Sequence, residues 1–462
     1  MKPMSVHTIE TLADMETPVS AFLKLCRGRP DSFLLESVET KDITGRYSIV
    51  AFDPILLTEL YPDTLVVENG DGRTTAPAQE FFPKIQEMLA HVGVDRLPEL
   101  PCVGSLMGFV GYDAVRLIEK LAPAKPHALP IARLVFPSRF VVFDHLRRVM
   151  ILMAIDNDPQ ICAAKVKEIR QGLVQPLSFK TSAAQIGMQA PPKERFCQSV
   201  TKAQEYIAAG DIFQVVLSDA FEGRTDLDPF QVYRRLRMTS PSPYMFFCDF
   251  GGYQLFGCSP ETLVKVRDRE VTLRPIAGTR GRSDNPRKDL MLEQEMLASE
   301  KECAEHVMLV DLARNDAGRV CRYGSVSVDP YMIVERYSHV MHIVSQVQGA
   351  LREDAHAVDA FMAGFPAGTV SGAPKVRAME IIDELEASPR GPYAGAVGYF
   401  GPHDDTDTCI AIRTILFEGD RFTIRVGAGI VADSVPEMEF KEIENKAAQS
   451  IAAVKAAARE EL

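Results

Sequence analysis

Hydrophobic and polar positions along this chain mostly alternate in short runs, which is the pattern of half-buried strands. The segment RLVFPSRFVVFDHLRRVMILMAI, residues 133–155, predicts two strands around a polar turn, and residues 161–172 predict the next helix. A second helix is predicted over 194–209, where apolar side chains share one face and a glycine follows. A strand is predicted directly after it, over 212–217.

The later part of the chain repeats this alternation of many short strands with few helices. The helices expected there are 229–238, a single long helix over about 289–313 and an alanine-rich helix from 436 onward. The strands expected there are 244–250, 252–257, 262–267, 270–275, 343–349, 396–400, 408–418 and 422–429. Hairpin-spaced strands among a few long helices predict an α+β fold of mostly antiparallel sheets flanked by helices, not a doubly wound parallel sheet.

One shift in composition divides the chain. Residues 175–192, QPLSFKTSAAQIGMQAPP, are polar and small and end in two prolines, which is typical of a linker. With 462 residues and about 100–200 residues per domain, we expect an N-terminal domain over 1–175 and a second domain over 190–455.

Charge and cysteine content narrow the possible functions. The 51 basic and 63 acidic residues leave a net charge of −12, which argues against a nucleic-acid binder or an anionic-membrane binder. The nine cysteines contain no C-x-x-C pair, which disfavours disulfide scaffolds and zinc ribbons. No apolar run approaches the ~20 residues of a membrane span, and the first residues lack an apolar signal core. We therefore expect a cytoplasmic protein.

Two glycine-rich segments resemble nucleotide-binding motifs but fail in detail. GAGIVA at 427–432 follows a predicted strand, yet it lies too near the C-terminus to open a βαβ unit. AGTVSGAPK at 367–375 lacks the Ser or Thr that follows the lysine of a phosphate-binding loop.

Two pairs of glutamates carry the clearest candidate chemistry. Glu302 and Glu305 share one side of a predicted helix, as do Glu439 and Glu442, with Lys446 one turn further along the second helix. One interpretation is a solvated helix face with a Glu442–Lys446 ion pair. The other is that the two helices face each other across a cleft, where a few carboxylates hold Mg²⁺. Spacing alone leaves both open.

A series of ordered strings resembles a known family, the chorismate-utilising enzymes, and within it the large-subunit (component I) branch of the anthranilate synthases. The strings, from about residue 210 to 447, are GDIFQVVLS, SPSPYMFF, FGCSPE, RPIAGTRGR, EHVMLVDLARND, RYSHVMHIVS, GTVSGAPKVRAMEII, YAGAVGYF, DTCIAIR, GAGIVADSVP and ENKA. LLESVE and RYS extend the resemblance into the first part of the chain.

The resemblance implies a large α/β sandwich whose site lies between its sheets, with chorismate as substrate and Mg²⁺ bound to the ring carboxylate. Carried over residue by residue, the metal ligands are Glu302, Glu305, Glu439 and Glu442, and Glu261 is the general acid that protonates the departing C4 hydroxyl. The residues implied in substrate binding are Gly278, Thr279, Thr369, Tyr393, Arg413, Gly427, Gly429 and Lys446, with His342 beside the ring. From sequence alone Arg413, inside an apolar strand, could equally form a buried ion pair, and His342 could be structural.

Two positions indicate the branch. Members that add water carry a lysine base where this chain has Gln214, and a glutamine amide can orient ammonia but cannot deprotonate water. Aminodeoxychorismate synthases typically have lysine where this chain has Ala277. The resemblance thus implies that chorismate and ammonia give anthranilate and pyruvate. An aminodeoxychorismate or aminodeoxyisochorismate synthase, or a non-catalytic chorismate-binding regulator, are the alternatives.

The resemblance also implies partners and regulation. No G-x-C-x-G elbow of a glutaminase is present, so a separate glutaminase subunit is expected to supply ammonia from glutamine. LLESVE and SPSPYM resemble motifs of the site at which L-tryptophan inhibits the anthranilate synthases, although Ser240 stands where asparagine is usual. The residues implied in that regulatory site are Glu36, Ser37, Pro241, Tyr244, Met245 and Cys409. The alternative is that the leucines of LLESVE merely pack in a strand and that Glu36 is a charge on the surface.

Overall fold

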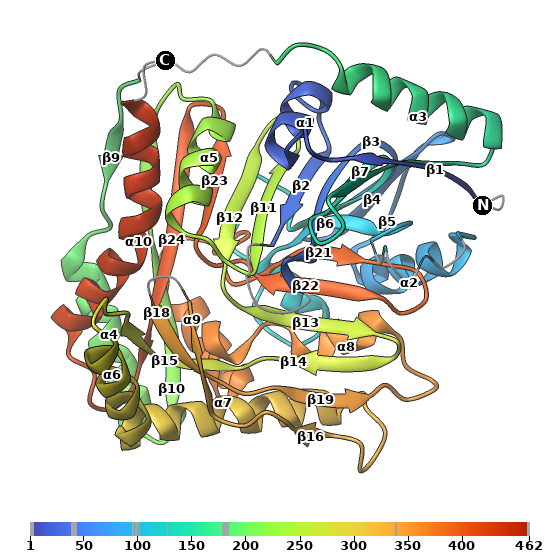
Figure 1. Ribbon diagram of the computed structural model, residues 1–462. Helices are drawn as coiled ribbons and strands as arrows, with labels where there is room; N and C mark the ends of the chain where they lie inside the picture. Colours follow the sequence, from blue (N-terminus) through green and yellow to red (C-terminus); the bar gives the residue numbers. More distant parts are fainter. Residues whose placement is uncertain are drawn as a thin grey trace.

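A computed structural model describes residues 4–37, 44–94, 97, 100, 102–126, 128–177, 184–337 and 340–459, and Figure 1 shows their arrangement. Its α-helices are α1 (Pro18–Leu25), α2 (Phe81–His91), α3 (Pro159–Leu173), α4 (Lys193–Ala208), α5 (Pro229–Thr239), α6 (Pro286–Ala298), α7 (Glu300–Gly318), α8 (Ala357–Gly364), α9 (Lys375–Leu385) and α10 (Pro436–Ala458). Short 3₁₀ turns include η3 (Tyr112–Leu117) and η4 (Gly368–Val370).

The strands of the first part of the chain are β1 (Ser5–Leu12), β2 (Ser32–Glu36), β3 (Tyr47–Leu60), β4 (Thr64–Asn69), β5 (Gly72–Pro77), β6 (Leu106–Val110), β7 (Ala132–Asp144) and β8 (Val149–Asp156). β3 pairs with β7 along nearly its whole length, and β7 pairs with β8 around the predicted polar turn. The strand pair and the helix expected over 133–172 are therefore confirmed.

The strands of the second part are β9 (Gly187–Gln189), β10 (Gln214–Arg224), β11 (Tyr244–Asp249), β12 (Gln254–Ser259), β13 (Thr262–Arg267), β14 (Glu270–Leu273), β15 (Ile276–Gly281), β16 (Ser327–Val328), β17 (Ile333–Arg336), β18 (Val340–Val344), β19 (Val347–Ala350), β20 (Gly372–Ala373), β21 (Ala396–Phe400), β22 (Thr406–Ile410), β23 (Thr414–Glu418) and β24 (Arg421–Ile430). Within the described residues, 21 strands belong to one sheet system, and β15, β17 and β18 form a separate sheet. The pairings described are antiparallel, as an α+β fold of this kind requires.

The two parts of the chain contribute neighbouring strands to the same sheet. β2 pairs with β11, and β6 pairs with β21. Residues 178–183 of the expected linker lie outside the described residues, and the rest of it contributes β9, which pairs with β10. The division into domains 1–175 and 190–455 stays a prediction.

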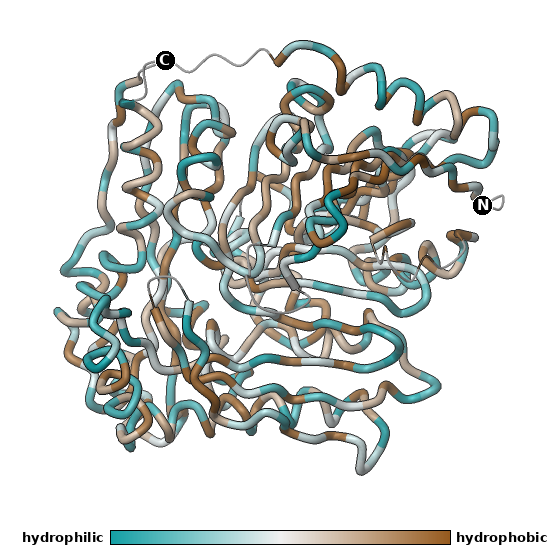
Figure 2. Tube along the Cα trace, viewed as in Figure 1, coloured by the Kyte–Doolittle hydropathy of each residue, from teal (hydrophilic) through white to brown (hydrophobic). Residues whose placement is uncertain are grey.

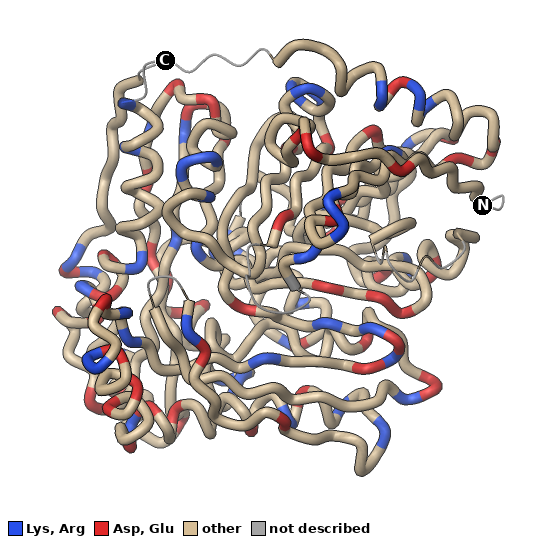
Figure 3. The backbone as a smooth tube through the Cα atoms, in the orientation of Figure 1, with Lys and Arg blue, Asp and Glu red and all other residues tan. Residues whose placement is uncertain are grey.

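Helices cover the outside of the sheets because each has one apolar face. α10 packs on β24 and contacts α4 and α5, whereas α3 packs on β1 and β8 at the other end of the molecule. α7 runs along β15 and β19. Apolar residues concentrate on the strands between these layers in Figure 2, and charges of both signs are interspersed over the outer elements in Figure 3. In the described part of the chain no helix combines the length and apolar character that crossing a membrane requires.

Three element predictions were wrong, because each treated two elements as one. The single helix expected over 289–313 is two helices, because Ser299 has an extended backbone and its hydroxyl accepts a hydrogen bond from Glu302 N, which begins α7. The strand expected over 408–418 is also two strands, β22 and β23, with residues 411–413 between them. Likewise the run 343–349 is divided between β18 and β19, which belong to different sheets.

Candidate active site

Glu261 lies in the short connection between β12 and β13, where its side chain is buried. The Thr369 hydroxyl, from η4, donates a hydrogen bond of 2.9 Å to Glu261 Oε1. Burial raises the pKa of Glu261 to about 8, although the Thr369 hydrogen bond and the charges of Lys446 and Arg413 act in the opposite direction. Glu261 is therefore a protonated carboxylic acid at neutral pH, which is the state a general acid needs.

Arg413 lies in the connection between β22 and β23, not inside a strand as the apolar run indicated. Its backbone has φ +50°, a left-handed conformation that is unusual for arginine and costs about 1–3 kcal/mol. The charge of its guanidinium acts on both Glu261 and His342, and within the described residues it forms no ion pair. A half-buried guanidinium without a protein carboxylate is suited to bind an anionic ligand.

His342, on β18, is held by the neighbouring strand β15. Its Nδ1 lies 3.0 Å from the Gly278 carbonyl oxygen and 3.0 Å from Thr279 Oγ1. Gly278 has φ +61° at an irregularity in the strand register between Ala277 and Thr279. Burial lowers the pKa of His342, so the ring is neutral, Nδ1 carries the proton and Nε2 is left as an acceptor.

Two glycines of β24 let neighbouring side chains approach the strand closely. A Cβ atom on Gly427 would lie 2.6 Å from Tyr393 Oη, and one on Gly429 would lie 2.7 Å from Gln214 Nε2. The Lys446 ammonium, from α10, donates to the Gly427 carbonyl oxygen at 2.8 Å. Any side chain at these glycines would displace groups that the sequence predicts to bind substrate.

Gln214 begins β10 and is buried beside the acidic helix α7. Its amide donates a hydrogen bond to the Glu305 carboxylate. Its Oε1 atom is buried and, within the described residues, has no hydrogen-bond partner. An unsatisfied buried acceptor is costly, so this oxygen is available to an N–H donor of a ligand.

The four predicted metal ligands come from α7 and α10. Burial, together with the charge of Glu442, raises the pKa of both Glu305 and Glu439. Glu442 itself is exposed and forms an ion pair with Lys446, in which Oε1 and Nζ lie 2.7 Å apart. This ion pair is the one that the interpretation as a solvated helix face predicted. The two helices nevertheless bring their carboxylates into electrostatic range of each other, which the spacing alone could not establish.

Glu302 has one satisfied and one unsatisfied oxygen. Its Oε1 accepts a hydrogen bond of 2.6 Å from Arg280. Its Oε2 is buried and has no hydrogen-bond partner in the described chain. A Cβ atom placed on Gly278 would lie 3.0 Å from this Oε2. Among the described residues no three His, Cys, Asp or Glu side chains are grouped closely enough to hold a metal ion by themselves. A carboxylate oxygen without a protein partner, as at Glu302, fits Mg²⁺, which typically takes one or two carboxylates and completes its shell with water and substrate oxygens.

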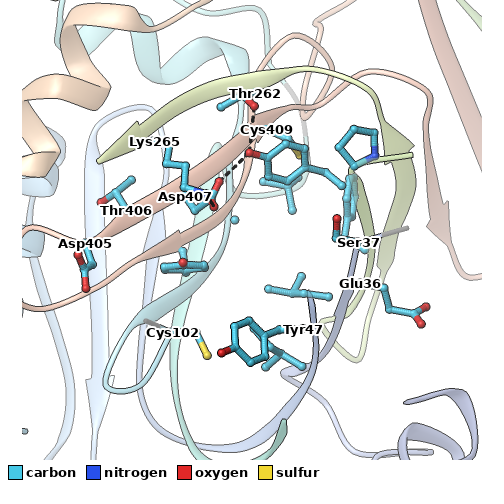
Figure 4. Close-up of a pocket in the computed structure, with 18 of the residues that line it drawn as sticks. Glu36, Ser37, Tyr47, Cys102, Thr262, Lys265, Asp405, Thr406, Asp407 and Cys409 are labelled. Atoms are coloured by element: carbon cyan, nitrogen blue, oxygen red, sulfur yellow. Dashed lines mark hydrogen bonds and ion pairs between the residues drawn. The ribbon is translucent and has the colours of Figure 1, made fainter. Parts of the chain in front are cut away.

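A second cavity, of about 570 Å³, opens between the first part of the chain and β11, β13 and β22. Its volume suits a small organic ligand. Of the residues predicted for a regulatory site, those that line it are Glu36, Ser37, Tyr244, Met245 and Cys409. In Figure 4 the cavity is bordered by Asp407, whose carboxylate accepts a hydrogen bond of 2.7 Å from Tyr244 and pairs with Lys265.

Two predicted members of this regulatory set are placed differently. The Glu36 carboxylate is directed away from the other lining side chains in Figure 4, because Arg237 and Tyr233 bind it at 2.7–2.8 Å from α5. Glu36 is therefore a buried carboxylate held from α5, not a surface charge, and its place in the regulatory set stays a prediction. Pro241 is not among the lining residues, whereas Pro243 is.

Sequence reasoning missed the polar wall of this cavity. Asp407 and Lys265 alternate with apolar residues in DTDTCI and TLVKVR, a pattern that equally describes the solvent side of an ordinary strand. Only the pairing of β13 with β22 shows that the two side chains meet.

Comparison with known proteins decides the family. A model of the family described as chorismate binding enzyme matches residues 34–452. The chain belongs to this family. The predicted α+β fold is also that of solved members and is therefore confirmed.

Relatives with a curated name cover almost all of the chain. It is 43% identical to anthranilate synthase component 1 of Acetivibrio thermocellus over 97% of its own length and 95% of the relative's, and 42% identical to that of Thermus thermophilus over 96% and 97%. The crystal structure of anthranilate synthase component I from Streptococcus pneumoniae matches with a TM-score of 0.80 and 35% identity over 95% of this chain and 99% of that one. The menaquinone-specific isochorismate synthase from Escherichia coli, 21% identical with a TM-score of 0.73 over 98% of this chain and 95% of that one, shares the fold.

Proposed function

We propose that this chorismate binding enzyme is the large subunit of an anthranilate synthase, which converts chorismate and ammonia to anthranilate, pyruvate and water. The observation that carries the proposal is that a buried, protonated Glu261 and the Arg413 guanidinium lie in the same site. Among the described residues no carboxylate forms an ion pair with Arg413. The curated relatives that bear this name, at 41–43% identity over nearly the whole chain, support it.

Positively charged and neutral polar residues have different roles in binding the two substrates. Arg413 and Lys446 are the cations that hold carboxylates of chorismate, and the Tyr393 hydroxyl lies at the same stretch of β24 as Gly427. Gln214 Oε1 accepts a hydrogen bond from ammonia and so turns its lone pair toward ring atom C2.

The acid step belongs to Glu261. As the C2–N bond forms, the C4–O bond breaks, and Glu261 gives its proton to the departing hydroxyl, which leaves as water. Loss of the C2 proton and of the enolpyruvyl group, which leaves as pyruvate, then makes the ring aromatic. The neutral His342 ring orients the reacting face through Nε2, since Nδ1 is committed to β15.

Of Glu302, Glu305, Glu439 and Glu442, one or two would bind Mg²⁺ directly and the others through bound water. When bound, the ion offsets the repulsion among these carboxylates and withdraws electrons from the ring through its carboxylate. The unsatisfied Glu302 oxygen and the raised pKa values of Glu305 and Glu439 support this assignment.

Two residues favour this reaction over the alternatives. Gln214 occupies the place of the base that water addition needs, and a glutamine cannot take a proton from water. Ala277 provides no nucleophile for the route to aminodeoxychorismate. In the cell, a separate glutaminase subunit would supply the ammonia.

We also propose that L-tryptophan inhibits the enzyme from the second cavity. Met245, Tyr244 and Pro243 offer an apolar and aromatic surface for the indole. The Ser37 hydroxyl, buried without a hydrogen-bond partner in the described chain, offers a polar contact for the ammonium group.

A single assay tests the catalytic proposal. The purified chain is incubated with chorismate, Mg²⁺ and an ammonium salt, and anthranilate is followed by its fluorescence. Fluorescence that grows with enzyme, and that disappears with EDTA, is expected. A non-fluorescent amino product would indicate an aminodeoxychorismate or aminodeoxyisochorismate synthase instead, and chorismate binding without turnover would indicate a regulator.

A further inference from the structure

A buried cluster of charged side chains lies behind the candidate site and takes no part in the chemistry described above. Glu386 follows α9, and its carboxylate binds Arg390 at 2.7 Å and Arg425 at 3.4 Å. Each of these residues is at most 7% exposed. The two guanidinium groups, with Ser218 of β10, keep the pKa of Glu386 below its usual range despite its burial.

Arg390 reaches beyond this carboxylate to two main-chain carbonyl groups. Its Nη1 donates to Val370 O and its Nη2 to Val216 O, both at 2.7 Å. Val370 follows Thr369, whose hydroxyl binds the general acid Glu261, and Val216 lies two residues after Gln214 on β10.

The same guanidinium also packs on aromatic rings. Its central carbon lies 4.6 Å from the ring centre of Tyr112, in η3, and 5.6 Å from that of Tyr393. Tyr393 in turn directs its hydroxyl at Gly427. One side chain therefore contacts three separate segments, which carry Thr369, Gln214 and Tyr393.

We infer that Arg390 is a positioning residue that fixes the turn of Thr369 against β10 and thereby holds the Thr369 hydroxyl on Glu261. This inference rests on the proposed function. A lysine cannot replace it, because an ammonium lacks the planar fork that bonds Glu386, Val370 and Val216 at once and also stacks on two rings.

The inference predicts a specific change in pH dependence. Glu261 is faced by the Thr369 hydroxyl, the Lys446 ammonium of α10 and the Arg413 guanidinium, and all three favour its ionised form. If Arg390→Lys releases the Thr369 turn, one hydrogen bond to the carboxylate is lost, and the pKa of Glu261 rises further. The alkaline limb of the kcat profile is then expected to move up by about half a unit to one unit, the effect of losing one such bond.

The experiment compares Arg390→Lys with two other variants at a constant concentration of free ammonia. Thr369→Val removes the hydrogen bond directly and is expected to shift the limb in the same direction. Arg425→Lys is the matched control, since Arg425 is equally buried and binds the same Glu386 but does not contact Val370. Arg425→Lys is expected to lower the melting temperature and to leave the alkaline limb of the kcat profile unchanged. Arg390→Lys is expected, in addition to moving this limb, to lower kcat by roughly 10- to 100-fold.

The double variant Arg390→Lys, Thr369→Val completes the test, because two changes that act through one hydrogen bond give a combined shift no larger than either alone. The positioning role would be overturned if the alkaline limb of the kcat profile moves in Thr369→Val but not in Arg390→Lys. Glu261 would then remain the acid. If Arg390→Lys gives no folded protein, Glu386→Gln is tested in its place. This variant removes the charge that orients the Arg390 guanidinium. The inference then requires an upward shift of the alkaline limb of the kcat profile that is smaller than the shift in Thr369→Val. Absence of anthranilate from the unmodified enzyme would instead refute the proposed function.

Discussion

At the scale of single residues, the candidate site depends on two groups in unusual states. Glu261 is a buried carboxyl that keeps its proton. Arg413 has a left-handed backbone and, in the described part of the chain, forms no ion pair with a carboxylate. Both states cost free energy in the empty protein, and a ligand carboxylate next to Arg413 would recover part of that cost. Sites that combine such groups are typical of catalysis rather than of packing.

Replacement of the acid should separate binding from chemistry. Glu261→Gln keeps the size of the side chain and removes the proton donor, so chorismate binding should persist while kcat with ammonia falls at least ~10²-fold, the usual contribution of a general acid. Glu270→Gln, at an exposed position of β14, is the control and should retain full turnover. Equal turnover in the two variants would remove Glu261 from the mechanism.

The same replacement has a second consequence, for stability. Between pH 4.5, the ordinary pKa, and about pH 8, the folded protein retains a proton on Glu261 that the unfolded chain has lost. Because the folded state then binds more protons, the stability contributed by this group decreases as pH rises through that interval. Glu261→Gln should therefore raise the melting temperature relative to the unmodified enzyme by more at pH 9 than at pH 5. Parallel melting profiles for the two proteins would contradict the raised pKa.

At the scale of elements, the break between α6 and α7 places two of the carboxylates that we propose to bind Mg²⁺. Ser299 ends one helix and begins the next, which puts Glu302 in the first turn of α7, beside Gly278 of β15. α10 brings Glu439 and Glu442 from the far end of the chain to the same region. The fold thus joins carboxylates that are about 140 residues apart in sequence.

Loss of the helix cap should test this role of Ser299. Ser299→Ala removes the hydroxyl that accepts from Glu302 N, and the free energy of unfolding should decrease by about 1 kcal/mol. Ser299→Asp restores an acceptor at the same place and should recover most of that loss. The comparison is made by urea denaturation, and an unchanged midpoint for Ser299→Ala would show that the cap contributes nothing.

Removal of single carboxylates should weaken the response to magnesium. Glu305→Gln and Glu442→Gln replace a charged ligand with a neutral amide, which hard cations bind poorly, so half-maximal activity should need at least ~10-fold more Mg²⁺. Glu437→Gln, exposed on the same α10, is the control. Far-ultraviolet circular dichroism should be the same for the three variants. Normal activity of the first two at low Mg²⁺ would refute the metal assignment.

At the scale of the whole molecule, the second cavity joins the two parts of the chain to the candidate site. Ser37 follows β2 of the first part, which pairs with β11 of the second part. On the other wall, Tyr244 lies 3.0 Å from the hydroxyl of Thr262, the residue next to Glu261. A ligand that moved this wall would also move Glu261, the proposed general acid, which gives the proposed effector a physical connection to the candidate site.

Tryptophan should stabilise the folded protein and inhibit it. At a concentration of 100 times its Kd, a ligand of the native state adds about 2.7 kcal/mol to the free energy of unfolding, which is visible as a higher melting temperature. Ser37→Phe should abolish both effects, because the phenyl ring fills the cavity, and it should retain turnover. Ser37→Ala, which keeps the cavity open, should remain inhibited but with weaker affinity. If tryptophan neither inhibits nor stabilises the unmodified enzyme, the regulatory proposal fails and the catalytic one stands.

Most of the elements, and the candidate residues of the site, could be predicted from the sequence. Periodicity located α4, α5 and α10 and the hairpin of β7 and β8 to within a few residues, since each buries one face of a regular element. The prediction of one long helix was wrong although Ser299 and Glu302 form the capping pattern of a helix start. The apolar residues before and after Ser299 keep the spacing of a single helix, which hid the break.

How the candidate residues meet could not be predicted and depends on the folded chain. No local pattern shows that α7 approaches α10, that Arg390 reaches β10 and η4, or that Glu36 is already bound by Arg237. Arg413 illustrates the limit: its apolar neighbours predict a continuous strand, and the left-handed turn that frees its guanidinium is imposed by the strands on either side. Spacing along a chain specifies which face a residue occupies, whereas the protonation state and the partner of a side chain depend on long-range contacts and burial, which the fold alone supplies.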